Sequence, residues 1–284
     1  METHPRSSAA TTVWLPWGYP IIVNPTEIIG WAIYSRAIYD LPLTEALFRL
    51  AGPGHTVVDG GANIGYATSI LAARVGSAGK LHCFEPNPQV FRELLKNVAV
   101  WENRGQRGAF VLYQEALGAR AGVATLHIPA SSDWNGGRAS IESTEISEPG
   151  ARMDVPVVAL DRVFSNGETI SVVKLDLEGF ESEALRGMET LLHERRIGAI
   201  VFEEIRPYPA PSHDFLKACG YSVFGLDYRI RGIACLPEKQ PRFDPVYGSP
   251  TNYVATCEPA KTVRQLESGF WQSFGPASYL SRWA

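Results

Sequence analysis

Several features are missing from this chain of 284 residues, and each absence excludes a class of protein. The four cysteines lie far apart and form no Cys-x-x-Cys pair, which argues against a disulfide scaffold and against a structural zinc site. Basic residues are not in excess: 26 Lys and Arg stand against 30 Asp and Glu, for a formal net charge of −4. No electrostatic feature therefore predicts a nucleic-acid partner or an anionic membrane partner.

Long apolar runs and a leader segment are absent as well. No run approaches the roughly 20 apolar residues of a membrane span, and the opening Met-Glu-Thr-His-Pro lacks the basic start and apolar stretch of a secretory leader. Hydrophobic residues nevertheless make up 45% of the chain and charged residues 20%, which is typical of a globular protein. We expect a cytoplasmic protein, a monomer or homodimer, that binds neither nucleic acid nor membrane.

From residue 55 onward, short apolar runs alternate with amphipathic stretches. The expected strands span 55–59, 80–84, 109–115, 172–176 and 199–203, and the expected helices span 66–75, 88–99 and 181–194. This alternation is typical of a Rossmann-like α/β fold, a mostly parallel central sheet with helices on both faces. Segments 222–226 and 252–257 are expected to add the last strands.

The remaining segments do not follow this alternation. Residues 1–50 are rich in aromatics and predict a helical cap, in which Trp14, Trp17 and Tyr19 pack on the core or line the acceptor site. Short alternating runs within about 121–160 predict a small antiparallel β insertion, whose polar loop 131–137 is a connection or a lid. The expected organisation is a cap at 1–50, a main domain at 51–260 and a tail at 261–284.

A glycine-rich turn follows the first strand and leads directly into a helix. Its sequence is Asp59-Gly60-Gly61-Ala62-Asn63-Ile64-Gly65. In a βα unit such a turn presents the backbone to a nucleotide, and we expect Gly61 and Gly65 to allow a close approach to that ligand. Asp59, at the strand exit, is a candidate acceptor beside the turn. The sequence therefore predicts a cofactor loop here.

The second and third strands also end in polar residues. The second ends in Glu85-Pro86-Asn87, and an acidic residue at this place commonly accepts hydrogen bonds from a ribose diol. The third ends at Glu115-Ala116, near the expected position of an adenine. Since the carboxyl ends of parallel strands share one edge of the sheet, we expect these residues to join the glycine turn in one site.

The fourth and fifth strands bring ionisable groups to the same edge. The fourth runs into Lys174-Leu175-Asp176-Leu177-Glu178-Gly179, and strand alternation places Lys174, Asp176 and Glu178 on one side. Charges in an otherwise buried strand are costly unless they are paired or functional. The fifth strand ends in Glu203-Glu204, and His213 follows nearby, either as a catalytic group or as an exposed loop histidine.

Two cofactors compete for the glycine turn. A dinucleotide fingerprint requires Gly-x-Gly-x-x-Gly, and Ala62 occupies the middle glycine position. The turn with Glu85 after the next strand is instead similar to the S-adenosylmethionine loop of class I methyltransferases. A nicotinamide-dependent oxidoreductase and a catalytically silent nucleotide-binding protein remain alternatives. No ligand spacing predicts a metal.

Four motifs together resemble the FkbM family of methyltransferases. They are Val-Val-Asp-Gly-Gly-Ala-Asn-Ile-Gly (57–65), Phe-Glu-Pro-Asn-Pro (84–88), Leu-Asp (160–161) and Val-Lys-Leu-Asp-Leu-Glu-Gly-Phe-Glu (173–181). The similarity runs from about residue 28 to 204 and includes the helix Ala-Leu-Arg-Gly-Met (184–188). Gly60 departs from the valine that many members have at this place.

The resemblance implies transfer of a methyl group from S-adenosylmethionine to a hydroxyl of a small molecule, such as a secondary metabolite or a sugar, with S-adenosylhomocysteine as product. N-methylation and, less favoured, C-methylation fit the same scaffold. A hydroxyl nucleophile needs a base or an electrostatic partner for its proton. Asp176 and Glu178 are the first choices, and Lys174 is expected to keep one of them ionised; Asp176 is also a candidate for binding the cofactor. Glu203, Glu204 and His213 are the second choices.

Overall fold

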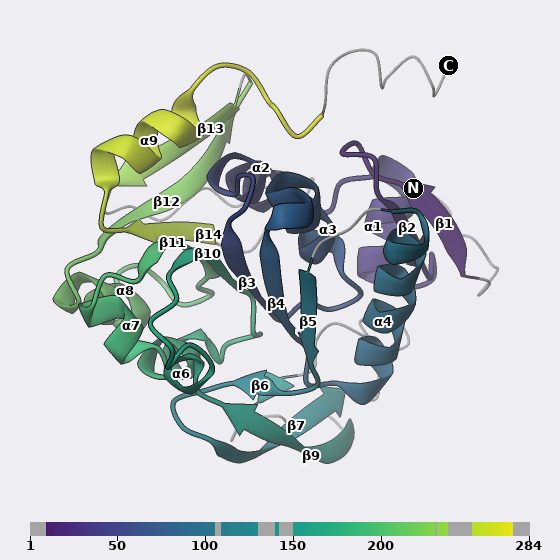
Figure 1. The fold of residues 1–284 in the computed structure, drawn as a ribbon, viewed down its shortest axis with the longest axis horizontal. Coiled ribbons are helices and arrows are strands. Elements are labelled where there is room, and N and C mark those ends of the chain that lie inside the picture. The colour runs from purple at the N-terminus through teal and green to yellow at the C-terminus, as the bar shows by residue number, and fades with distance from the viewer. Residues whose placement is uncertain are drawn as a thin grey trace.

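The computed structural model describes residues 10–105, 109–129, 140–141, 150–230, 232–237 and 252–274. Its centre is an eight-stranded sheet in the order β13-β12-β14-β11-β10-β3-β4-β5 (Figure 1). The parallel strands are β3 (Thr56–Gly60), β4 (Lys80–Phe84), β5 (Ala109–Tyr113), β10 (Ile170–Leu175) and β11 (Ile197–Glu203). Three strands with antiparallel pairing complete the sheet: β14 (Asn252–Thr256), β12 (Ser222–Arg229) and β13 (Gly232–Pro237). This order confirms the expected fold class.

The chain begins the sheet at β3, moves outward to β5 and returns to pair β10 with β3. The strand order therefore reverses between β3 and β10, which is where open α/β sheets bind their ligands.

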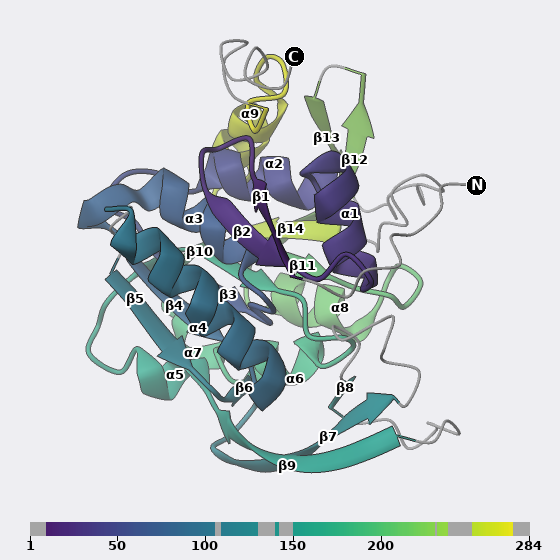
Figure 2. The ribbon, with the colours of Figure 1, turned by 90° about the vertical axis from the view of Figure 1, so that its right-hand side faces the viewer.

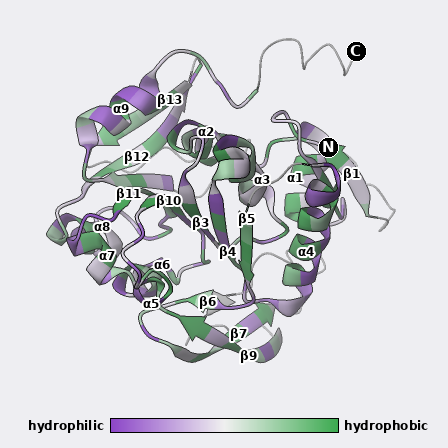
Figure 3. Ribbon diagram, viewed as in Figure 1, coloured by the Kyte–Doolittle hydropathy of each residue, from purple (hydrophilic) through white to green (hydrophobic). Residues whose placement is uncertain are grey.

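Helices cover both faces of the sheet because its strands are apolar on both sides. One face packs against α2 (Leu41–Leu50), α3 (Tyr66–Val75) and α4 (Pro88–Asn103). The other packs against α5 (Leu160–Val163), α6 (Glu181–Arg186), α7 (Glu189–His193) and α8 (Pro211–Ala218). Hydrophobic and hydrophilic stretches alternate along α4 (Figure 3), as expected for a helix with one buried side.

The helix expected over 181–194 is interrupted between α6 and α7. Gly187 lies there, and a Cβ atom on it would come within 2.0 Å of the backbone oxygen of Gly118. The chain therefore breaks the helix where it packs against the start of the insertion. The sequence pattern contained no sign of this contact.

The insertion is a second, four-stranded sheet that lies beyond β5 (Figure 1). It contains β6 (Ala116–Leu117), β7 (Gly122–Pro129), β8 (Ser140–Ile141) and β9 (Gly150–Val158). Its main pairing, β7 with β9, is antiparallel as expected, whereas β6 pairs with β9 in parallel. The loop at 131–137 lies outside the described residues.

The N-terminal segment contains a β-hairpin as well as the expected helices. The hairpin strands are β1 (Thr11–Trp14) and β2 (Pro20–Val23), followed by α1 (Ile28–Arg36). The hairpin is attached to α4, where the Asn97 amide oxygen accepts a hydrogen bond from the Ile22 N–H at 2.7 Å and Trp101 Nε1 donates to the Pro20 oxygen. Tyr19 packs on the core and Trp17 is half-buried, whereas Trp14 is exposed.

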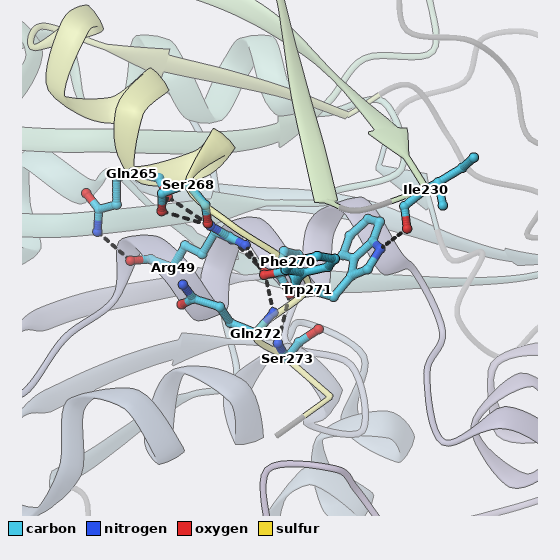
Figure 4. A network of polar contacts seen from close by, with 9 residues as sticks. Arg49, Ile230, Gln265, Ser268, Phe270, Trp271, Gln272 and Ser273 are labelled. Carbon is cyan, nitrogen blue, oxygen red and sulfur yellow. Dashed lines mark hydrogen bonds and ion pairs between the residues drawn. The ribbon is translucent and has the colours of Figure 1, made fainter. Parts of the chain in front are cut away.

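The C-terminal segment returns to the N-terminal half of the chain. Helix α9 (Pro259–Glu267) packs beside α2 (Figure 2), and the residues after it run across α2 (Figure 4). Buried Arg49 donates to the backbone oxygen of Phe270 at 2.6 Å, while its partner Glu45 accepts from the N–H groups of Gln272 and Ser273 at 2.7 and 2.8 Å. Among the helices of the described ranges, none is long and apolar enough to cross a membrane.

Candidate active site

The glycine turn is fastened to β4 and β10 by its own backbone. The N–H groups of Gly61 and Ala62 both donate to the Phe84 oxygen, at 3.0 and 2.9 Å. Gly61 has φ +73°, and a Cβ atom on it would stand 1.9 Å from the backbone oxygen of Asp176. Gly65 has φ +101°, and a Cβ there would meet Leu94 and Trp101 at 2.9 Å. Neighbouring parts of the protein therefore already require glycine at both positions, and close approach of a ligand there stays a prediction.

Within the turn, the residues differ in their access to solvent. Gly60, Ala62 and Gly65 are buried, whereas Gly61 and Asn63 are half-buried. Asn63 has φ +50°, a conformation that asparagine tolerates better than most side chains. Of these five predicted cofactor residues, Gly61 and Asn63 are thus the ones that a ligand can reach.

Asp59 lies at the exit of β3, as the sequence indicated. Its side chain is fully buried, and Oδ2 accepts a hydrogen bond from Thr68 Oγ1 at 2.6 Å. Oδ1 lies 3.3 Å from Lys174 Nζ in an ion pair. Asp59 therefore stabilises the end of the strand through Thr68 and Lys174, and its role as an acceptor for the cofactor stays a prediction.

Glu85 follows β4, at the place where the sequence predicts a residue that binds the ribose of a nucleotide. Its Oε2 accepts from the Asn63 N–H at 3.0 Å, and its Oε1 accepts from the Asn87 N–H at 2.9 Å. Burial raises the pKa of Glu85 to about 7, while these two hydrogen bonds act in the opposite direction. The carboxylate is therefore held in a fixed orientation by the glycine turn and by the residue after β4.

The other residues expected around a nucleotide lie at the ends of β4 and β5. Pro86 is half-buried, and Asn87 is buried and caps α4 by accepting from the Gln89 N–H at 3.0 Å. Glu115 is half-buried, whereas Ala116 is buried as the first residue of β6. Asn87 thus caps a helix in addition to its predicted role in the cofactor site.

Lys174 is buried and joins the fourth strand to the glycine turn. Its Nζ donates to the backbone oxygens of Gly60 and Gly61 at 3.1 and 2.6 Å, and lies 3.7 Å from Asp176 Oδ2. Burial lowers the pKa of Lys174, but the charges of Asp59 and Asp176 outweigh it, so the net shift is upward. The predicted pairing with a carboxylate is thus present, and the lysine holds backbone and carboxylates in place.

Asp176 and Glu203 form a carboxyl pair at the ends of β10 and β11. The strands pair Leu175 with Phe202, so Asp176 and Glu203 follow at neighbouring positions, and the Asp176 side chain is 31% exposed whereas Glu203 is buried. Burial raises the pKa of Glu203 strongly, and the carboxyl groups of Asp176, Glu178 and Glu181 raise it further. Of the two side chains, Asp176 is therefore the one that an acceptor can approach.

Glu178 and Glu181 border this pair. Glu178 is half-buried with φ +53°, and its carboxyl group raises the pKa of Glu203. Glu181, which the sequence analysis did not assign to the site, is buried, and its Oε1 accepts from the N–H groups of Leu177 and Gly179 at 2.7 and 3.3 Å. It therefore shapes the turn that presents Asp176 and Glu178. Within the described ranges, no group of His, Cys, Asp and Glu has the arrangement of a metal site.

Tyr39 and Asp40 from the cap are the site neighbours that the sequence analysis missed. Asp40 Oδ2 accepts from the Asn252 amide at 2.8 Å, and Asn252 stands opposite Glu203 in the pairing of β14 with β11. The charges of Asp176, Asp40, Glu203 and Glu178, after burial itself, raise the pKa of the Tyr39 phenol. No motif indicated these residues.

His213 and Glu204 do not belong to this group. His213 is fully buried at the start of α8, where Nδ1 accepts from the Ala210 N–H at 2.8 Å and the ring packs 4.3 Å from Tyr253. Glu204 pairs with Arg206 at 2.8 Å and accepts from Ser212 on α8. Because His213 is buried, the alternative of an exposed loop histidine is wrong, whereas a catalytic role for His213 stays a prediction.

Comparison with known proteins identifies a family. A family model described as the methyltransferase FkbM domain matches residues 59–223, more than half of the chain. The match therefore starts and ends further along the chain than the resemblance found in the sequence, which runs from about residue 28 to 204. No curated protein matches the chain.

Solved structures show distant similarity. Methyltransferase FkbM from Methylobacillus flagellatus KT has 14% identity and a TM-score of 0.45, covering 75% of this chain and 50% of its own. An S-adenosylmethionine-dependent O-methyltransferase from Thermotoga maritima has 11% identity and a TM-score of 0.42, covering 79% and 69%. Fibrillarin from Aeropyrum pernix has 12% identity and a TM-score of 0.40, covering 87% and 94%. The chain spans half the length of the first structure, and similarities this weak are no guide to substrate.

Proposed function

The chain belongs to the FkbM methyltransferase family, and we propose that it transfers the methyl group of S-adenosylmethionine to a hydroxyl of a small molecule. Family membership makes the chain a methyltransferase with S-adenosylmethionine as its methyl donor, and it makes the nicotinamide alternative the weaker one. The proposal concerns the acceptor, the methylated atom and the residues that act on it. It rests on the accessible Asp176 carboxyl group, which pairs with Lys174 at the end of β10 and has Glu203 beside it at the end of β11.

The residues at the sheet edge suit this cofactor. Each Glu85 oxygen accepts one backbone N–H, and a carboxylate oxygen has a further lone pair for a ribose hydroxyl. The half-buried Gly61 and Asn63 lie on the same side, between Glu85 and Asp176. When bound, S-adenosylmethionine supplies an electrophilic methyl group on a cationic sulfur. Glu85 would bind the ribose of the cofactor. The glycine turn would bind the part of the cofactor that extends from the ribose toward β10.

Asp176 is the group that removes the acceptor proton in this proposal. Its Oδ2 lies 3.7 Å from Lys174 Nζ, and its side chain is 31% exposed, so an acceptor can reach it. As the new C–O bond forms and the C–S bond of the donor breaks to leave a thioether, the hydroxyl becomes acidic and its proton passes to the accessible Asp176 oxygen. The main task of the protein is to align the hydroxyl with the methyl group, since the donor is already reactive.

The same carboxylates favour a hydroxyl over an amine. Carboxylates next to an amine stabilise its protonated form, which has no lone pair for attack. A hydroxyl stays neutral and gains a proton acceptor. The acceptor is therefore proposed to be a hydroxylated small molecule, and N-methylation is the less favoured alternative.

The test is transfer of labelled methyl from S-adenosylmethionine to a panel of sugars, phenols, amines and RNA. We expect transfer to a hydroxyl compound, and an Asp176→Asn variant should lose about 10²–10⁴-fold in kcat, the usual contribution of a positioned base. Asp154→Asn, an exposed change on β9, serves as the matched control and should keep full activity. Unchanged turnover in Asp176→Asn, or transfer to amines or RNA alone, would contradict the proposal.

A further inference from the structure

Lys174 contacts both of the turns that carry the proposed cofactor and acceptor groups. Its buried Nζ donates to the backbone oxygens of Gly60 and Gly61 at 3.1 and 2.6 Å. An ammonium group has three N–H donors, so one is left for the neighbouring carboxylates. The nearest oxygens of Asp59 and Asp176 lie 3.3 and 3.7 Å from Nζ. A single side chain of β10 thus joins the glycine turn to the turn that follows β10.

The backbones of the same two turns are also in direct contact. β10 pairs in parallel with β3, with Leu175 beside Gly60. The N–H of the following residue, Asp176, donates to the Gly60 oxygen at 3.2 Å. A Cβ atom on Gly61 would stand 1.9 Å from the backbone oxygen of Asp176. A shift of the glycine turn therefore also moves the backbone that carries Asp176.

Lys174 adds a link between side chain and turn that the backbone contacts do not supply. Hydrogen bonds from a charged donor are stronger than those between neutral groups, and this donor is only 2% exposed to water. On one side it binds the oxygen of Gly61, a half-buried turn residue that a cofactor can reach. On the other side it pairs with Asp176, whose side chain is 31% exposed to an acceptor. One ammonium group thus acts on both halves of the site.

We propose that Lys174 is a positioning residue that couples the cofactor-binding turn to the Asp176 carboxylate, so that the base is aligned by the same group that fixes the turn. This inference rests on the proposed function, because it takes the cofactor to lie on the glycine turn and Asp176 to receive the proton. Lys174 acts through the Gly61 oxygen and through Asp176, and is not itself the base. Removing its ammonium group therefore weakens cofactor binding and makes Asp176 a less effective base. A lysine that only stabilised the fold would do neither in a folded variant.

The test is a double-mutant cycle of Lys174→Met and Asp176→Asn in the full chain, measured as kcat at saturating S-adenosylmethionine. Asp176→Asn should lower kcat by about 10²–10⁴-fold in the wild-type background. In the Lys174→Met background its effect should be at least about tenfold smaller, because the base is no longer held in position. Calorimetry with S-adenosylmethionine should show that Lys174→Met weakens binding by about 10–100-fold, the range of hydrogen bonds to a charged group.

Lys80→Met is the matched control. Lys80 is the first residue of β4, at the amino end of the parallel strands; it is 46% exposed and pairs with Glu168 at 3.2 Å. Its replacement should leave kcat and cofactor affinity unchanged. Lys174→Met leaves the buried charge of Asp59 without this partner. If the variant does not fold, the double change Asp59→Asn with Lys174→Met removes both charges and becomes the parent of the same cycle.

The outcomes separate this inference from the proposed function. Equal losses from Asp176→Asn in the two backgrounds, or an unchanged cofactor affinity in the folded Lys174 variant, would overturn the coupling and leave the proposed function intact. Transfer to amines alone would overturn the proposed function, and the same cycle on that acceptor would still decide the coupling. If no compound is methylated, the proposed function fails, and the affinity of the Lys174 variant for S-adenosylmethionine decides whether the lysine fixes the turn.

Discussion

At the scale of single residues, each carboxylate of the site has a distinct environment. Asp59 is fully buried, Glu85 is oriented by two backbone N–H groups, and Asp176 is partly exposed beside Lys174. The sequence identified these residue types at the correct strand ends. It could not rank their exposure, because that depends on contacts such as Thr68 with Asp59, which side-chain packing decides.

Glu181 leads to a prediction about pH. Burial raises its pKa to about 7 from an ordinary 4.5, so the folded protein binds a proton that the unfolded chain loses between these values. The contribution of Glu181 to the free energy of unfolding is therefore full below about pH 4.5 and declines as the pH rises through 7. Glu181→Gln has no such proton to lose. Between pH 5 and pH 8, the free energy of unfolding of this variant should therefore rise by on the order of 1–2 kcal/mol relative to that of wild type.

Urea denaturation of the cofactor-free protein at several pH values measures this difference. Asp154→Asn, whose parent residue is exposed, should show no such gain and controls for general charge effects. A Glu181→Gln variant that loses stability relative to wild type as the pH rises would show that the carboxyl group is ionised in the folded protein.

At the scale of elements, the sequence predicted the parallel strands and α3 closely. The hydrophobic pattern within each of these segments is enough to indicate the element. The hairpin of β1 and β2 escaped prediction because its four-residue strands depend on docking to Asn97 and Trp101 of α4. The break between α6 and α7 was not predicted either; it lies where Gly187 packs closely against Gly118 from another part of the chain.

The contact between the glycine turn and the β10 turn predicts a specific loss of stability. Gly61→Ala would place Cβ 1.9 Å from the Asp176 oxygen, so the two turns must separate. Gly54→Ala has a similar φ of +77° and no atom within 4 Å of the new Cβ, so it measures backbone strain alone. We expect Gly54→Ala to cost about 1–2 kcal/mol and Gly61→Ala clearly more. Equal losses in thermal unfolding would contradict the close contact.

At the scale of the whole molecule, segments far apart in sequence complete the site. Asp40 reaches Asn252, and the Glu45–Arg49 pair of α2 holds the C-terminal segment at 268–273 (Figure 4). Alternation of strands and helices predicted the fold class, but it could not predict contacts across more than 200 residues. The domain boundaries, the cytoplasmic location and the oligomeric state stay predictions.

The central claim, that the glycine turn and Glu85 bind S-adenosylmethionine, is tested most directly by calorimetry with S-adenosylmethionine and NAD. We predict that wild-type protein binds S-adenosylmethionine and not NAD. Glu85→Ala should weaken that binding by about 1.5–3 kcal/mol, the usual value of hydrogen bonds to a charged group. Binding of NAD alone, or an affinity for S-adenosylmethionine that Glu85→Ala leaves unchanged, would contradict the account.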